Sequence, residues 1–169
     1  MFSIGQYVIC GNKGVCIVEN ITTLDISGVD RAKKYYILKP MYVSASTVYV
    51  PVDSVSTMRS VLTMEEAERL IKSIPEIAGL EIKNERFVEQ DDKECMKSNR
   101  CEELIRLLKT IYFRKQKRLE AGRKETAVDC KYFKIAEDIL FGELAVALSI
   151  ERKDVGNYIS RQLSEIRLA

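Results

Sequence analysis

The spacing of apolar residues changes once along this 169-residue chain, close to Met58, and this change limits the possible folds more than any other feature. Before Met58, β-branched and aromatic residues gather in short runs, which are typical of strands. After it, apolar residues recur every three or four positions, which is the period of an amphipathic helix. We therefore predict an α+β protein of two domains, at residues 1–58 and 59–169.

Four short runs carry the strand signal, at residues 7–10, 15–18, 35–38 and 47–50. Between the first two, the sequence Gly11-Asn12-Lys13-Gly14 predicts a hairpin turn. Pro51 has no backbone N–H, which suits the end or the edge of a sheet. Several strands within about fifty residues indicate a small, strongly bent β-barrel, and such a barrel can offer an open edge to a partner's strand.

The connection between the domains is predicted at residues 57–62, directly before a helix start. Thr63 and Glu66 have the spacing of a capping box, in which each side chain accepts the other residue's backbone N–H. The helix that they open is expected to stop before Pro75, because the residue before a proline disfavours the helical conformation.

Three further helix signals follow. Residues 101–121 form the clearest amphipathic pattern, and Gly122 is a plausible C-cap. Thr126 is expected to cap the next helix, and Ser149 a last one. Short connections favour a compact, all-α bundle. The apolar side of the helix at 101–121 is assigned to Leu104, Leu108, Ile111, Tyr112 and Leu119.

The residue inventory argues against catalysis. The chain has no histidine, and its five cysteines form no C-x-x-C pair. A zinc site and a Ser–His or Cys–His nucleophile are therefore not expected. We predict a non-enzymatic protein without metal, cofactor or small-molecule substrate, and an unrecognised carboxylate pair is the enzymatic alternative. The chain also lacks a long apolar run and a secretory start, so we expect a cytoplasmic protein without membrane contact.

Positive charge is concentrated in one segment. Residues 106–124 hold eight basic residues and one acid, Glu120, which leaves 19 basic and 24 acidic residues elsewhere. Lys and Arg at this density indicate contact with phosphates, without preference for a base sequence. An ordinary solvated helix face is the alternative interpretation. Four of these residues are predicted to face solvent together, opposite the apolar stripe: Arg106, Lys109, Arg114 and Lys117.

Several segments resemble one protein family. Residues 111–122 (IYFRKQKRLEAG) and 132–145 (YFKIAEDILFGELA) resemble the helices of CarD/CdnL regulators. The opening GQYV and GNKGV segments and the later TVYVPVD segment resemble the strands of that family. The likeness keeps the same order over residues 2–165. The chain is thus similar to bacterial transcription regulators that bind RNA polymerase.

The resemblance implies a Tudor-like or SH3-like barrel that binds the β subunit of RNA polymerase. It also implies a helical domain that contacts promoter DNA and stabilises the open promoter complex. Many family members have arginines where this chain has Tyr49 and Leu24, so a charge-assisted bond to polymerase would be lost here. The polymerase contacts that the resemblance implies are Leu24, Ile26, Thr47, Tyr49 and Pro51.

The DNA-facing side departs from the family in one respect. The family places a tryptophan wedge before its DNA-facing helices, whereas this chain has no tryptophan and carries residues 81–84 there. Phe87 is a candidate substitute wedge, with packing inside the helical domain as the alternative. A second functional hypothesis is therefore a polymerase- or protein-binding adaptor with little DNA affinity. The expected DNA contacts are Arg86, Phe87, Arg114, Lys115, Lys117, Arg118, Arg123, Lys124 and Lys131.

Overall fold

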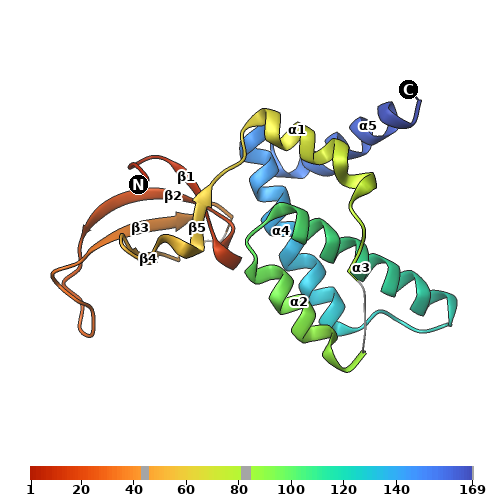
Figure 1. Cartoon of the computed structure of the whole chain (residues 1–169), viewed down its shortest axis with the longest axis horizontal. Helices are drawn as coiled ribbons and strands as arrows, with labels where there is room; N and C mark the ends of the chain where they lie inside the picture. The colour runs from red at the N-terminus through yellow and green to blue at the C-terminus, as the bar shows by residue number, and fades with distance from the viewer. Residues whose placement is uncertain (43–45, 81–84, 169) are drawn as a thin grey trace. The chain divides into compact units, whose positions relative to one another are not determined.

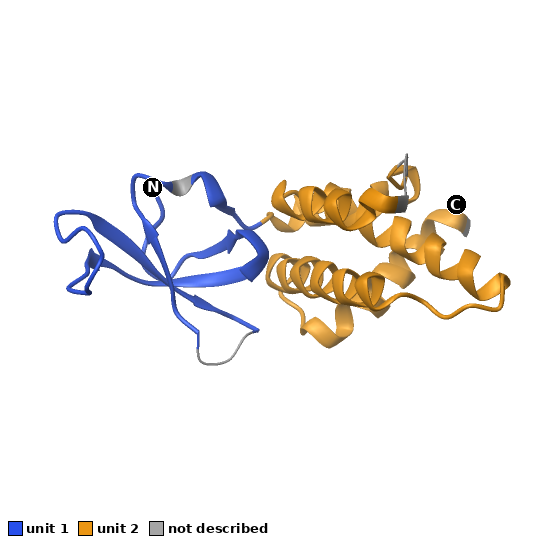
Figure 2. Ribbon diagram, turned by 90° about the horizontal axis from the view of Figure 1, so that it is seen from below, with its two compact units in different colours: residues 1–61 blue, residues 62–169 orange. Residues whose placement is uncertain are grey.

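The computed structural model describes residues 1–42, 46–80 and 85–168. The chain divides into two compact units, Met1–Val61 and Leu62–Ala169 (Figure 2). The described part of the first unit forms an antiparallel sheet, and that of the second unit forms a set of α-helices (Figure 1). This confirms the predicted α+β architecture. The division lies three residues after the boundary predicted at residue 58.

The first unit is one antiparallel sheet with the strand order β4-β3-β2-β1-β5. The predicted turn joins β1 to β2, where the N–H of Cys10 donates to the carbonyl of Gly14 at 3.0 Å. The sequence pattern did not assign residues to the last strand, because three residues are too few to show an alternating pattern. The strands are β1 (Tyr7–Cys10), β2 (Val15–Thr23), β3 (Lys34–Pro40), β4 (Val48–Pro51) and β5 (Met58–Ser60).

One face of this sheet forms the core of the first unit. Side chains alternate between the two faces of a strand, so Tyr36 and Leu38 of β3 face this core whereas Tyr35 and Ile37 do not. The register between β2 and β3 shifts between Val18 and Asn20, and such a bulge bends the strand and increases its twist. The buried side chains of this core are Val8, Cys10, Cys16, Val18, Tyr36, Leu38, Val50 and Met58.

The second unit is built from helices whose starts were largely predictable. The Thr63 hydroxyl accepts the N–H of Glu66 at 3.2 Å, and the Glu66 carboxylate accepts the N–H of Thr63 at 2.8 Å. The first helix ends before Pro75, as expected. Thr126 likewise caps its helix by accepting the N–H of Asp129 at 3.1 Å. The helices are α1 (Met64–Ser73), α2 (Val88–Lys97), α3 (Cys101–Glu120), α4 (Ala127–Leu148) and α5 (Val155–Leu168).

Helix α4 is the centre of the second unit, because it contacts each of the other four helices. It is apolar around most of its circumference, which is typical of a helix enclosed by others. The innermost side chains of this unit come from four different helices: Ile71, Leu107, Ile111, Leu144 and Val155. No helix in the described ranges is both long enough and apolar enough to cross a membrane.

One expectation about the helices was wrong, and one helix was missed. Ser149 does not cap the last helix: it ends α4 in the left-handed conformation, with φ of 55°, and α5 begins only at Val155. Helix α2 was not predicted. Its sequence is mostly charged, and one of its two buried residues is Asp92, which no apolar periodicity detects.

Candidate functional site

The first candidate surface is the free edge of β4. In the described residues β4 pairs only with β3, and the N–H of Val52, just after the strand, donates to the carbonyl of Lys34 at 2.9 Å. Hydrogen-bonding direction alternates along an antiparallel strand, so the N–H and C=O of Tyr49 point away from β3. The Tyr49 side chain is 47% exposed. This edge can therefore offer both a donor and an acceptor to another strand.

The outer face of the sheet next to this edge is apolar. Ile37 pairs with Tyr49 across β3 and β4, and Tyr35 pairs with Pro51. Tyr35 and Ile37 are partly buried, whereas Tyr36 and Leu38, which alternate with them, face the core. Sequence reasoning missed Tyr35 and Ile37 as members of this surface. The alternation with their buried neighbours was the signal that could have identified them.

The loop between β2 and β3 lies at one end of the same edge. Ile26 is exposed there, and its carbonyl accepts the N–H of Val29 at 3.2 Å. An ion pair of 3.3 Å between Lys33 and Asp53 joins the end of this loop to the segment after β4. Ile26 is therefore at the end of the sheet where Pro51 lies. Thr47, directly before β4, is also exposed.

Leu24 requires a correction. It was expected to contact a partner, but only 8% of its surface is exposed. As an apolar residue directly after β2, it packs inward. It can support the β2–β3 loop, but it does not form part of the exposed surface.

The second candidate surface is the basic segment of α3, and here too one expectation was wrong. Arg114 was predicted to face solvent and to contact DNA, but its side chain is only 16% exposed. Its guanidinium lies 3.0 Å from the carboxylate of Asp92 on α2 and 2.7 Å from that of Asp129 on α4. Arg114 thus joins three helices from within. Burial raises the pKa of Asp92, although the positive charge of Arg114 acts in the opposite direction.

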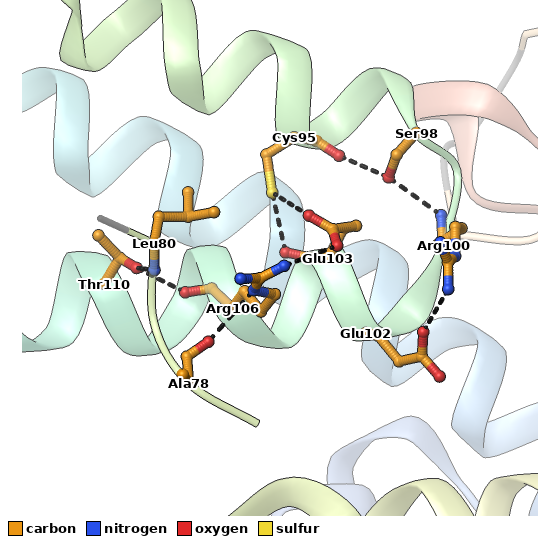
Figure 3. Close-up of polar contacts among 9 residues, drawn as sticks. All are labelled: Ala78, Leu80, Cys95, Ser98, Arg100, Glu102, Glu103, Arg106 and Thr110. Carbon is orange, nitrogen blue, oxygen red and sulfur yellow. Dashed lines mark hydrogen bonds and ion pairs between the residues drawn. The ribbon is translucent and has the colours of Figure 1, made fainter. Parts of the chain in front are cut away.

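Arg106 is also held by the protein. Figure 3 shows its guanidinium between the carbonyl of Ala78 and the carboxylate of Glu103, each at 3.3 Å. One turn further along α3, the Thr110 hydroxyl accepts the N–H of Leu80 at 2.7 Å. A Cβ atom at Gly79 would lie 3.0 Å from that hydroxyl oxygen, so the segment after α1 needs glycine to approach α3 this closely.

Lys109 secures the same segment. Its ammonium donates to the carbonyls of Ile74 and Ile77, the second at 2.6 Å. Partial burial lowers the pKa of Lys109. Of the four residues predicted to face solvent together, Lys117 is exposed and the other three are partly buried.

The remaining charge is gathered where α3 ends. Gly122 has φ of 71°, its N–H donates to the carbonyl of Leu119 at 3.0 Å, and the N–H of Arg123 donates to that of Arg118 at 2.8 Å. These two bonds form a Schellman motif. The Arg118 guanidinium donates to the carbonyl of Lys124 at 2.7 Å, which fixes the turn. We call the following residues the basic turn: Lys115, Lys117, Arg118, Arg123 and Lys124.

The other predicted DNA contacts are dispersed. Residues 81–84, which correspond to the wedge position of the family, lie outside the described residues. Phe87 is 58% exposed, so the alternative in which it packs inside the helical domain is not observed. Arg86 and Lys131 are also exposed, and the Lys131 ammonium lies 5.5 Å from the ring centre of Tyr132.

The apolar stripe of α3 also needs correction. Tyr112 and Leu119 were expected on the buried side, but both are exposed, as is Phe113. The last turns of α3 therefore present aromatic and basic side chains together. Tyr112 was assigned to the buried side because the periodicity argument treats every apolar residue near the stripe as part of the core.

A buried carboxylate lies where the chain enters the second unit. Glu143 on α4 has no exposed surface, and its two oxygens accept the N–H of Leu62 at 3.0 Å and the thiol of Cys101 at 2.9 Å. The role of Glu143 is therefore structural: it fixes the first residue of the second unit against α3 and α4.

Thiol reactivity can be predicted from burial. Four cysteines are buried and Cys130 is exposed. Burial raises the pKa of Cys16 and of Cys95 to about 12. At about pH 8, each of these thiols is therefore ionised in only roughly one molecule in ten thousand. A hydrogen bond to Glu125 raises the pKa of Cys130, but its sulfur is accessible. We expect a colorimetric disulfide reagent to modify Cys130 rapidly and all five cysteines after denaturation. Rapid modification of the folded Cys130→Ser variant would show that the other four cysteines are not buried.

Comparison with known proteins supplies the family of the first unit. Residues 2–62 match the model of the CarD-like/TRCF RID domain. No curated protein matches the chain at a significant level. The match covers all five strands of the sheet, including the open edge of β4. Residues 2–62 therefore belong to the CarD-like/TRCF RID domain family, in agreement with the predicted resemblance to CarD/CdnL regulators.

Proposed function

We propose that this chain is a cytoplasmic transcription regulator that binds the β subunit of bacterial RNA polymerase through its first unit. Its second unit contacts promoter DNA through backbone phosphates, and the protein stabilises the open promoter complex without catalysis. The observation that carries the proposal is the match of residues 2–62 to the RID domain model.

The polymerase contact is proposed at the edge of β4. A strand of the β subunit would pair with the outward N–H and C=O of Tyr49, and its side chains would pack on the Tyr49 ring and the neighbouring apolar face. Ile26, Thr47 and Pro51 border this edge. Contact through Tyr49 is apolar where many relatives use an arginine, so we expect binding to depend only weakly on salt.

A pull-down of the isolated β lobe of RNA polymerase tests this contact. We expect the double variant Tyr49→Ala, Ile26→Ala to lose at least about tenfold in retention, because two exposed apolar contacts are removed at once. Tyr49→Pro should have a similar effect, since proline removes the outward N–H without disturbing the bonds to β3.

Tyr7→Ala is the matched control, because Tyr7 is an exposed tyrosine on β1, which is paired on both sides. It should bind like the native chain. If the native chain does not retain the β lobe, the polymerase contact is refuted. If Tyr7→Ala weakens binding as much as the edge variants do, the partner lies on another part of the sheet.

The DNA contact is proposed at the basic turn. Lys117, Arg123 and Lys124 are exposed, and the Schellman motif fixes the backbone that carries them. Cations also interact favourably with the negative end of a helix, so they gather at the C-terminus of α3 at little cost. Phosphate contacts of this kind position a protein on DNA without reading its sequence.

The salt dependence of DNA binding tests this contact. Each phosphate contact contributes a slope of roughly −0.9 to a plot of log affinity against log salt concentration. We expect the Lys117→Ala, Arg123→Ala, Lys124→Ala variant to reduce the slope by roughly two to three and to weaken binding to every sequence equally. Fluorescence anisotropy with a labelled promoter duplex gives both quantities.

The charge-matched control removes three exposed lysines of the second unit that lie outside the basic turn: Lys72, Lys97 and Lys153. An equal change of slope in this control would show that net charge, rather than the basic turn, binds DNA. A native chain that does not bind the duplex even at low salt would favour the second candidate function. In that case the protein is a polymerase-binding adaptor without useful DNA affinity.

Stabilisation of the open complex follows from linkage. A protein that binds the open promoter complex more tightly than the closed one shifts the equilibrium towards the open state by the ratio of the two affinities. The polymerase contact concentrates the second unit near the promoter, so weak phosphate contacts suffice there.

A further inference from the structure

Two aromatic rings lie together on the solvent side of α3. Tyr112 is 52% exposed and Phe113 is 63% exposed, and their ring centres are 6.0 Å apart with an interplanar angle of 69°. The two rings meet edge to face, and more than half of each residue stays exposed to water. Neighbouring large aromatic residues that remain exposed indicate a binding surface, since burial would otherwise stabilise them.

The charges around these rings identify the partner. Residues three and four positions further along a helix lie on the same side, so Tyr112 and Phe113 adjoin Lys115, Gln116 and Lys117. The basic turn follows directly. The surface therefore combines flat apolar rings with cations, which is the combination that binds single-stranded nucleic acid. Lys115 already pairs with Glu125 at 3.4 Å, but a purely apolar protein partner would leave Lys117 without compensating charge.

We propose that Tyr112 and Phe113 form a stacking platform for unpaired bases of a single-stranded nucleic acid, whose phosphates contact Lys117 and the rest of the basic turn. The base must be unpaired, because the faces of bases inside a duplex are already stacked on one another. The inference rests on the proposed DNA contact of the second unit and extends it from the duplex to the separated strands.

Binding of the full chain to a labelled thymidine oligomer of about twelve nucleotides tests the platform. We expect the Tyr112→Ala and Phe113→Ala variants each to lose roughly tenfold in affinity, because each stacked base depends on one ring. Tyr112→Phe keeps the ring and should bind like the native chain. Tyr7→Ala removes an exposed ring from the first unit and should also leave binding unchanged.

A second measurement detects stacking directly. The chain has no tryptophan, so Phe113→Trp introduces a single tryptophan at the platform, which can be excited at a wavelength where the tyrosines do not absorb. Its emission should be quenched when the oligomer is added, and much less so when a duplex of the same length is added.

Several results would overturn the platform: native affinity of the double Tyr112→Ala, Phe113→Ala variant, absence of quenching, or no binding of the oligomer to the native chain. Loss of polymerase retention in the double variant, with oligomer binding intact, would identify the rings as a protein contact instead. The basic-turn variant separates the two proposals. If it weakens duplex binding while the ring variants bind normally, the DNA contact stands and the platform is refuted.

Discussion

Replacing Arg114 with methionine is expected to lower the free energy of unfolding of the second unit by about 3–5 kcal/mol, the largest effect that we predict. The reason is that two carboxylates, those of Asp92 and Asp129, are buried around this one guanidinium. Removing the cation leaves both without their counter-charge in a region that water does not reach. Urea unfolding followed by circular dichroism at a helical wavelength measures the loss, since the helices lie in the second unit.

The loss should depend on pH. Burial already raises the pKa of Asp92 in the native protein, and without Arg114 nothing opposes that effect. A carboxyl whose pKa is higher in the folded than in the unfolded state stabilises the fold below its unfolded pKa, and this stability is lost as the pH rises through the folded pKa. The deficit of Arg114→Met relative to the native chain should therefore grow between about pH 4 and neutrality.

Two comparisons make this prediction specific. Arg106→Met removes a partly exposed ion pair to Glu103 on the same helix and a hydrogen bond to the carbonyl of Ala78, and it should cost about 1 kcal/mol. Adding Asp92→Asn and Asp129→Asn to Arg114→Met should restore part of the stability, because the uncompensated charges disappear. If Arg114→Met costs no more than Arg106→Met, Arg114 is not a structural residue, and it becomes available again as a DNA contact.

The second large effect is expected at Glu143. Replacing it with alanine should lower the free energy of unfolding of the second unit by about 2–4 kcal/mol. The substitution opens a cavity and leaves the partly buried N–H of Leu62 without its acceptor. Glu143→Gln keeps the volume and one acceptor oxygen, so it should cost less. Exposed Glu165 supplies the control, and Glu165→Ala should change the stability little.

Hydrogen exchange at the Leu62 amide gives an independent measurement for Glu143. Its exchange should be slow in the native chain and at least about tenfold faster in Glu143→Ala, because the protecting hydrogen bond is gone. An amide that stays equally protected in this variant would show that another group holds the entry into the second unit.

Local signals in the sequence predicted much of the fold. The capping residues Thr63, Glu66 and Thr126 act on backbone groups within three positions, so their effect can be read without knowledge of the tertiary structure. The strands around the Gly11–Gly14 turn were predictable for the same reason.

The candidate surfaces were less predictable, because the decisive contacts are distant along the chain. The charge of Arg114 indicated solvent, but its partners Asp92 and Asp129 lie on two other helices, one of which was not predicted. Conversely, the apolar character of Tyr112 indicated the core although the ring lies at the surface. A periodicity assigns a side chain to one side of its own helix, and only packing decides what occupies that side.

The short free edge of β4 has a further consequence for how long a partner stays bound. The strand has four residues, and Pro51 offers an acceptor but no donor. A pairing strand can therefore accept the outward N–H of Tyr49 near the middle of β4. At Pro51 it can donate to the carbonyl, but it finds no N–H to accept. This asymmetry selects a single alignment of the incoming strand, and it also makes pairing between the β4 edges of two copies unfavourable. An association through so few main-chain bonds is expected to dissociate quickly, so under the proposed function the protein would leave RNA polymerase once the proposed DNA contact is lost.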